Sequence, residues 1–154
     1  MKAHDVPYET PKDLTPAFEY TPHTGDVGIR VCSATLEELF HHAAMGLVHT
    51  MVDPAELDGP VFERRCDADE DDLPMALNVW LTGFLSAGMA EGLFAHRIRV
   101  ETVEKPGRVR SLFWARRFDP ARQRLRTELK AVTFHGLKVQ AVAGGWEAAV
   151  VFDI

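Results

Sequence analysis

The chain has 154 residues, of which 46% are hydrophobic and 26% are charged, and its formal net charge is -6 at pH 7. This composition is that of one ordinary globular domain and excludes a disordered or collagen-like chain. We find no apolar run of the roughly 20 residues that cross a bilayer, and the N-terminus lacks the pattern of a signal peptide. The net acidity argues against non-specific nucleic-acid binding, which depends on neutralising phosphates. We expect a cytoplasmic protein with no membrane contact and no stable nucleic-acid contact of its own.

The first residues, MKAHDVPYETPKDLTP, are rich in proline and polar side chains. We expect a flexible leader over residues 1–16 and a single domain over residues 17–154. The two cysteines, Cys32 and Cys66, are too far apart for a C-x-x-C redox or zinc motif. Reduced thiols of this kind are typical of a cytoplasmic protein.

Charged residues are distributed unevenly along the chain. An acidic run lies between Asp53 and Asp72, and a basic run between Lys105 and Lys130 contains nine of the 17 lysines and arginines. Two interpretations stay open. The runs form two solvated faces, or the Arg-rich segment 108–126 contacts a phosphate-bearing or acidic partner.

The helices and strands are predicted from the periodicity of apolar residues and from helix-capping residues. Residues 27–32 alternate as a strand, and Thr35-Leu36-Glu37-Glu38 predicts the capping box of a helix over residues 36–51. Residues 61–66 are a candidate short strand. A second helix begins after Asp71 or Asp72 and ends within residues 88–92. Four strands are expected at about 94–103, 108–115, 129–139 and 146–153. This order predicts an α+β fold with two amphipathic helices packed on a mixed, largely antiparallel sheet.

Three short stretches carry candidate chemistry, and the first is the end of the chain, Val151-Phe152-Asp153-Ile154. Here the carboxylate of Ile154 is expected beside the side chain of Asp153. Two neighbouring carboxylates repel unless they are protonated, solvated or bridged by a cation, and Ca²⁺ and Mg²⁺ prefer such oxygen ligands. The alternative is a frayed, solvated terminus.

The second stretch is the turn HTGDVGI, residues 23–29, in which Asp26 stands between Gly25 and Gly28. Considered alone, Asp26 is an ordinary turn residue that bonds its own backbone. His23 is a candidate ligand or general base, but we expect it only to shape the turn.

The third stretch is KAVTFHGLKV, residues 130–139, with Lys130 at the end of an expected strand. There Lys130 points at anionic groups or is simply solvated. His41, His42 and His49 lack the H-E-x-x-H spacing of a zinc helix, and we interpret them as surface residues of the first helix. The sequence contains no nucleophile elbow, phosphate loop or dinucleotide fingerprint, which argues against an enzyme.

In combination, HTGDVGI, SATLEELF at 33–40, LKAVTFHGLKV at 129–139 and VVFDI at 150–154 resemble the archease family over about residues 17–154. The resemblance implies a small α+β protein that activates an RtcB-type RNA ligase in tRNA splicing or RNA repair. The activator promotes guanylylation and multiple turnover of the ligase and does not itself join RNA. The resemblance also implies a divalent metal site, for Ca²⁺ or Mg²⁺, formed by Asp26, Asp153 and Ile154, and it assigns Lys130 to the functional surface.

The chain departs from the family pattern at Gly25, where alanine is usual, at Arg116-Arg117, where we expect Gly-Glu, and at Gln123, where histidine is common. The expected metal ligands are intact. Two further functions stay open at this point. One is a stand-alone metal-dependent enzyme with His23 and Lys130 near the ion, and the other is a chaperone-like binding module in which the metal is purely structural.

Overall fold

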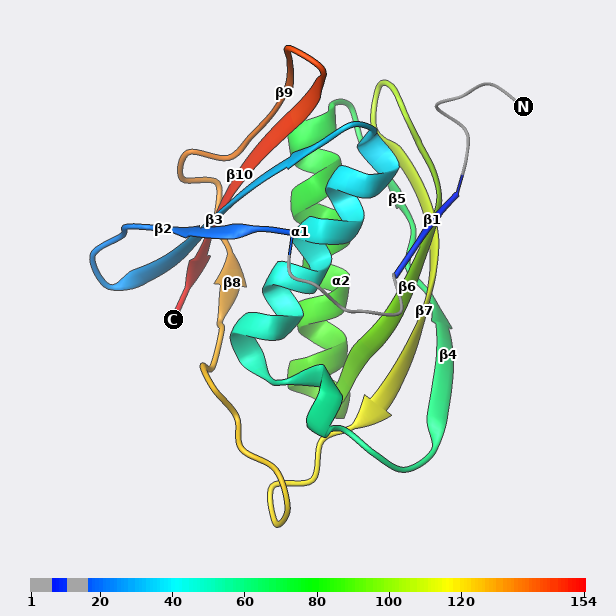
Figure 1. Cartoon of the computed structure of the whole chain (residues 1–154), viewed down its shortest axis with the longest axis vertical. Helices are drawn as coiled ribbons and strands as arrows, with labels where there is room; N and C mark the ends of the chain where they lie inside the picture. Colours follow the sequence, from blue (N-terminus) through cyan, green and yellow to red (C-terminus); the bar gives the residue numbers. More distant parts are fainter. Residues whose placement is uncertain (1–6, 11–16) are drawn as a thin grey trace.

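The computed structural model describes residues 7–10 and 17–154 and arranges them as two helices between two β-sheets (Figure 1). Sheet A has the order β1 (Tyr8–Glu9), β6 (Leu93–Glu104), β7 (Arg108–Arg117) and β4 (Val61–Arg65), and β5 (Ala68–Asp69) also pairs with β7. Sheet B has the order β2 (Glu19–Thr21), β3 (Asp26–Ser33), β10 (Gly145–Asp153) and β8 (Ala131–Val132), and β9 (Lys138–Val142) also pairs with β10. All pairings among these described strands are antiparallel. The predicted α+β class is confirmed, and the one expected sheet is in fact two.

Both helices begin at the predicted caps. Helix α1 spans Leu36–Met51, and the Thr35 hydroxyl accepts a hydrogen bond from the Glu38 amide at 3.2 Å. Helix α2 spans Leu73–Glu91, and the Asp72 carboxylate accepts one from the Met75 amide at 2.8 Å. A short 3-10 helix, η2 (Pro54–Glu56), follows α1. These caps satisfy amide groups that a helix cannot pair internally, so local sequence fixes where each helix starts.

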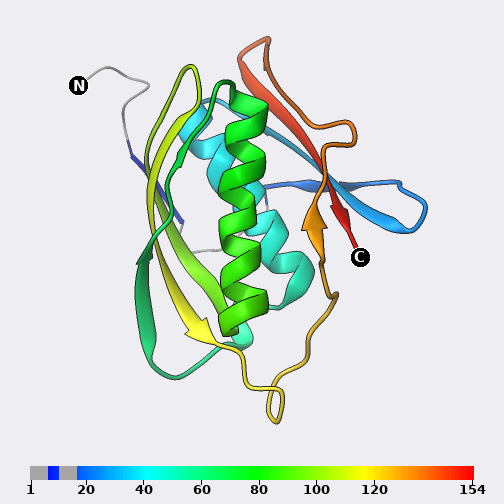
Figure 2. The same ribbon diagram turned by 180° about the vertical axis from the view of Figure 1, so that it is seen from behind.

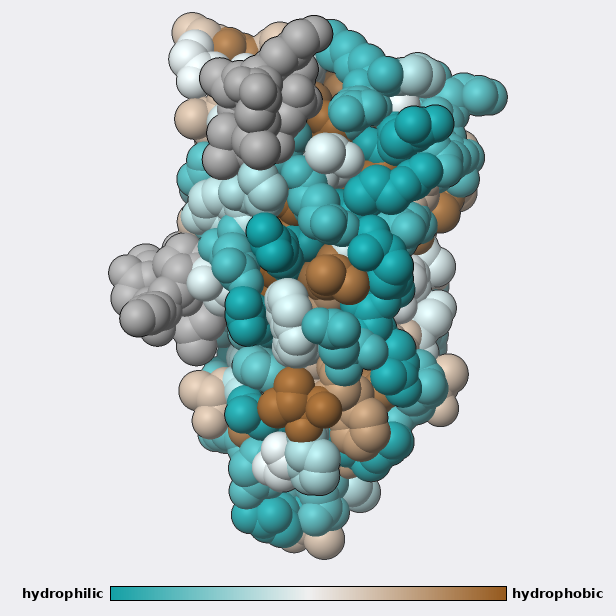
Figure 3. Space-filling model, turned by 90° about the vertical axis from the view of Figure 1, so that its right-hand side faces the viewer, coloured by the Kyte–Doolittle hydropathy of each residue, from teal (hydrophilic) through white to brown (hydrophobic). Residues whose placement is uncertain are grey.

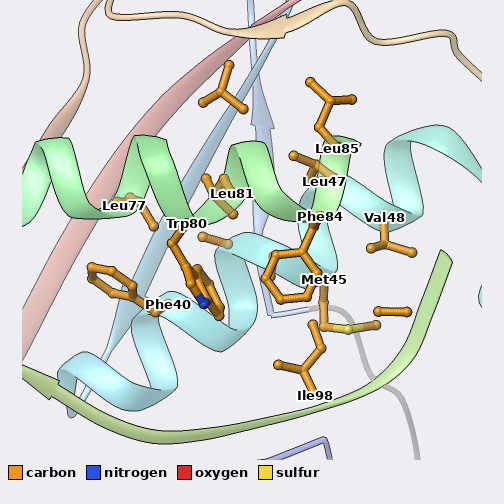
Figure 4. Packing of buried hydrophobic residues seen from close by; sticks show 14 of the residues in the cluster. Phe40, Met45, Leu47, Val48, Leu77, Trp80, Leu81, Phe84, Leu85 and Ile98 are labelled. Atoms are coloured by element: carbon orange, nitrogen blue, oxygen red, sulfur yellow. The ribbon is translucent and has the colours of Figure 1, made fainter. Parts of the chain in front are cut away.

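The core surrounds the two helices and includes residues of both sheets, and Figure 4 shows its part between the helices and Ile98 of sheet A. Trp80 of α2 is fully buried and packs on Phe40 of α1 and on Phe84, with ring centroids 5.6 and 4.8 Å away. Its indole N–H donates to the Cys66 carbonyl at 3.1 Å and to the Ser111 hydroxyl at 2.9 Å. Because the only polar atom of the side chain is satisfied, Trp80 contributes its whole apolar surface to the core.

The prediction that the histidines of α1 lie on its surface is wrong for two of the three. His41 and His42 are 1% and 6% exposed. The His41 Nε2 lies 2.7 Å from the Thr10 hydroxyl, and burial lowers the pKa of His41 to about 3. The periodicity of α1 alone could not show that β1 covers this side of the helix.

The flexible leader expected over residues 1–16 is wrong for Tyr8–Thr10, while residues 1–6 and 11–16 lie outside the described part of the chain. Tyr8 and Glu9 pair with Val100 and Arg99 of β6. The Thr10 amide donates to the Ile98 carbonyl, and the Thr10 hydroxyl accepts from the Ile98 amide. This segment therefore adds an edge strand to sheet A.

The strand expected over residues 129–139 is also interrupted. It divides into β8 and β9, with a turn between them that contains Gly136 at φ +59°. The Thr133 amide and hydroxyl both donate to the Val151 carbonyl at 2.9 Å. Val132 pairs with Phe152 and Lys138 pairs with Ala149, so the five residues 133–137 lie opposite only two residues of β10 and the regular ladder is interrupted between β8 and β9.

By length and composition, the 19-residue helix α2 could cross a membrane, since its most apolar window has a mean hydropathy of 1.3. We did not expect such a helix from the sequence. Half of that window is buried inside the molecule, as in a core helix. The outer face of sheet A is different in character, mostly hydrophilic with scattered apolar groups (Figure 3). Ion pairs such as Arg65–Glu101, at 2.7 Å, cross that face.

Candidate metal centre

The first and last residues of two neighbouring central strands bring two carboxylates together. Asp26 opens β3 and Asp153 closes β10, and the two residues are direct partners in the antiparallel register. The next pair, Val27 and Phe152, lies on the core face, where Phe152 is fully buried. Since side chains alternate along a strand, both aspartates lie on the opposite, outer face of sheet B. Directly opposed residues have Cβ atoms about 5 Å apart.

Ile154 and Lys130 lie at the same edge. The Lys130 amide donates to the Asp153 carbonyl at 2.8 Å, and Ala131 pairs with Asp153 in the register of β8 and β10. Continuing that register by one residue places Lys130 beside Ile154. Asp153, Ile154 and Lys130 are exposed, and Asp26 is half-buried. The fold therefore places all four residues named from the sequence at one edge of sheet B.

The charges at this edge are not balanced within the described residues, because neither Asp26 nor Asp153 forms an ion pair there. Like charges opposed across two strands are destabilising, and a hard divalent cation with oxygen ligands would relieve the repulsion. Among the described residues there is no group of three or more His, Cys, Asp or Glu side chains that could hold a metal ion. A site at this edge would therefore need the carboxylate of Ile154 beside the two aspartates, and three carboxylates are the type of oxygen ligand that Ca²⁺ and Mg²⁺ prefer.

His23 lies over the backbone of β3, close to this edge. A Cβ atom built on Gly28 would lie 2.2 Å from the Thr21 hydroxyl oxygen and 2.4 Å from a carbon of the His23 ring. Gly28 is therefore required because two side chains cross its outer face. Gly25, at φ +76°, provides the tight turn before Asp26. The His23 ring thus packs over the backbone of β3, and its role as only a shaping residue of the turn stays a prediction.

A surface pocket of about 530 Å³ adjoins Asp26. Its wall includes Tyr20 of β2, His49 of α1 and Arg126. The Arg126 guanidinium donates to the His49 carbonyl at 3.1 Å and lies 3.4 Å from the Asp53 carboxylate. Burial, together with the nearby Arg126, lowers the pKa of His49. The pocket thus places the Asp26 residue near an Arg126 guanidinium that is already paired with Asp53.

The sequence identifies His49 only as a surface residue of the first helix and Arg126 only as the end of the Arg-rich segment, and neither is a candidate site residue there. The available signal for Arg126 was its place in the basic run, and the structure shows what that run contacts. Arginines of the basic run pair with carboxylates of the acidic run: Arg108 and Arg110 with Asp69, Arg122 with Asp58, and Arg126 with Asp53. Four of the nine basic residues in the run therefore pair with carboxylates of the acidic run in the same chain, an arrangement that neither interpretation of the sequence included.

Comparison with known proteins agrees with this fold. The Archease protein family pattern matches residues 18–154. The chain is 31% identical over 140 residues to protein archease of Methanosarcina mazei, covering 89% of this chain and 95% of the relative. It is likewise 31% identical over 140 residues to protein archease of Pyrococcus furiosus, covering 89% and 98%. The chain therefore belongs to the archease family.

Solved structures give the same architecture. The solution structure of protein 1598 of Methanobacterium thermoautotrophicum is 28% identical and superposes with a TM-score of 0.74, covering 91% of this chain and 100% of that one. The crystal structure of an archease of Thermotoga maritima, described as a possible chaperone, is 23% identical with a TM-score of 0.59, covering 87% and 96%. Two helices packed on antiparallel sheets are thus the archease fold.

Proposed function

We propose that this archease is a metal-binding protein cofactor that activates an RtcB-type RNA ligase, promoting its guanylylation and multiple turnover in tRNA splicing or RNA repair. The observation that carries the proposal is the register pair of Asp26 and Asp153, which supports the ligand set expected from the family resemblance. The protein itself is not an enzyme in this proposal, and its partner is a protein. We place the activity in the cytoplasm, since Cys32 and Cys66 are free thiols.

In this proposal each residue at the edge of sheet B has its own role. Asp26, Asp153 and the carboxylate of Ile154 hold a divalent cation, Ca²⁺ or Mg²⁺, on the solvent side of the sheet. A bound divalent cation supplies positive charge that neutralises phosphate oxygens. Lys130, whose backbone amide donates to the Asp153 carbonyl, contributes a second positive charge at the same edge. The edge thus presents fixed positive groups toward the nucleotide phosphates of the ligase.

The test is ligase turnover with the archease present below the ligase concentration. Wild-type protein should accelerate multiple turnover and guanylylation, and Asp26→Asn or Asp153→Asn should reduce the acceleration at least about tenfold, because each removes one charged ligand. Lys130→Ala should reduce it without changing metal affinity. The matched control is Glu104→Gln, which removes an exposed carboxylate and should leave the activation unchanged. Ligase kinetics that do not respond to the wild-type protein would refute the proposal.

Extension of the chain tests the third ligand. A few residues added after Ile154 convert its carboxylate into a peptide group and move the terminal carboxylate away from Asp153, so divalent-ion affinity should fall. An unchanged affinity would show that Ile154 is not a ligand, while leaving the two aspartates in place.

Two outcomes would favour the other candidate functions. Turnover of a substrate by the archease alone would indicate a stand-alone enzyme. If Asp153→Asn only lowered the melting temperature and the binding of several client proteins alike, the metal would be structural and the protein a chaperone-like module. Measurements well below the melting temperature of each variant separate loss of fold from loss of activation.

A further inference from the structure

The outer side of helix α2 is an uncharged surface that no described element covers. Figure 2 shows α2 at the front of the molecule, with neither a strand nor α1 in front of it. The helix contains no charged residue from Leu73 to Ala90. Met75, Val79 and Met89 on this side are 37%, 37% and 46% exposed. A helix that is apolar on all sides is normally buried on all sides, so this side lacks a partner.

Five exposed residues of α2 follow the spacing of a helix-pairing seam. They are Met75, Val79, Thr82, Ser86 and Met89, which are separated by four, three, four and three residues; Ala90 and Glu91, at the end of the helix, are also exposed but lie outside this series. This alternation is the a/d pattern of two packed helices, in which one stripe of side chains faces a neighbouring helix. Small residues at the centre, Thr82 and Ser86, let a second helix approach closely, and the methionines at both ends adapt to it.

Charge divides the two ends of the seam. At the N-terminal end, Glu70 and Asp71 form no ion pair with described residues. At the C-terminal end, the Arg117 side chain lies beside Gly92 and its guanidinium donates to the Glu91 carbonyl, with no carboxylate partner among the described residues. Glu91 is nine residues after Thr82. At 100° per residue its side chain projects from the opposite side of the helix, away from the seam. One end is acidic and the other basic.

We propose that the outer face of α2 binds a second copy of this chain, with the two α2 helices antiparallel across a two-fold axis near Thr82. This arrangement brings Asp71 of each copy near the partner's Arg117 and covers the apolar seam of both copies at once. A partner of unrelated sequence would need a positive charge opposite Asp71 and a negative charge opposite Arg117. A second copy supplies both charges by symmetry. A parallel pair would oppose like charges and is excluded on that ground.

The proposal is independent of the ligase activity. The metal-binding edge of sheet B lies to one side of the open face of α2 (Figure 2), so the dimer leaves it open. One helix against one helix is a small interface, of the class formed by weak and transient complexes. We therefore expect a monomer–dimer equilibrium that responds to protein concentration.

Sedimentation equilibrium over a concentration series from about 10 to about 500 μM, a range suited to a weak interface, measures the association. Val79→Glu should raise the dissociation constant at least about tenfold, because it places a charge in the seam. The matched control is Val61→Glu, a similarly exposed valine on β4 of sheet A, which should leave association unchanged. Asp71→Arg and Arg117→Asp should each weaken the dimer about three- to tenfold, and the two changes combined in one chain should restore it.

Cysteine crosslinking in a Cys32→Ser background tests the orientation. In the dimer, Thr82→Cys of one chain should crosslink to Thr82→Cys of the other chain. Met75→Cys of one chain should crosslink to Met89→Cys of the other chain, and two chains that both carry Met75→Cys should not crosslink. A protein that stays monomeric across the series would overturn the proposal, as would a dimer that Val79→Glu leaves intact or rapid crosslinking of Met75→Cys to itself. If the protein is monomeric and Val79→Glu abolishes ligase activation, the proposal fails and the face belongs to the ligase.

Discussion

Replacing Asp26 by asparagine should change the stability of the domain in opposite directions without and with a divalent cation. The side chains of Asp26 and Asp153 are opposed in the register of β3 and β10. Two unit charges about 5 Å apart repel by about 0.8 kcal/mol in water and about 3 kcal/mol at an effective dielectric constant of 20. Because Asp153 is exposed, the repulsion lies near the lower value, about 1 kcal/mol. Asparagine has almost the same shape and removes it.

For a domain of this size, 1 kcal/mol shifts the melting temperature by about 2–4 °C. In a chelator, Asp26→Asn should therefore melt about 2–4 °C above the wild type. At a Ca²⁺ or Mg²⁺ concentration about 100 times the dissociation constant, the wild type gains about 2.7 kcal/mol, or about 5–10 °C, and the variant gains little. Scanning calorimetry in both buffers measures the reversal. If the variant melted below the wild type in chelator, or gained as much from the cation, the pairing of the two carboxylates would not control this site.

Three further predictions concern the scaffold. Asn78→Ala should cost about 1–3 kcal/mol in urea unfolding, because the buried Asn78 amide donates to the carbonyls of Val132 at 3.0 Å and Thr133 at 3.3 Å; a smaller cost would show that water replaces these bonds. Phe152→Ala should cost about 3–5 kcal/mol, since the ring is fully buried beneath the candidate site, and an unchanged urea midpoint would contradict this packing. The pKa of His41 is lowered to about 3 by burial, so as the pH falls His41 binds a proton in the unfolded chain before it does so in the folded chain. The free energy of unfolding should therefore decrease as the pH drops below about 6.5. His41→Gln should reduce that acid sensitivity in thermal scans from pH 7 to pH 4, and identical profiles would refute the assignment.

Local signals in the sequence were sufficient for the helices. Thr35 and Asp72 stand where a hydroxyl or carboxylate must accept the first free amides, and both do so. The division into two sheets could not be predicted, because strand order depends on pairings between residues far apart in sequence. The same is true of the buried side of α1, where Thr10 of the N-terminal segment meets His41.

The candidate site, too, could be predicted from the sequence only in part. The family resemblance named Asp26, Asp153 and Lys130, and the strand register brings them to one edge of sheet B. Their role as ligands and contact residues stays a prediction. The pocket beside them could not be derived, because Arg126 reaches it from a loop whose course no periodicity describes.

The position of β10 also determines when the functional edge can form. This strand lies in the interior of sheet B, between β3 on one side and β8 and β9 on the other, and its partner β3 is among the first elements of the described domain. Pairings between distant residues incur a large loop-closure entropy before they are stabilised, and they slow folding. Helices α1 and α2 and the strands β4 to β7 of sheet A can assemble from nearer neighbours. We therefore expect the edge that carries Asp26 and Asp153 to be completed in the last step of folding, so that only a fully folded chain carries the site.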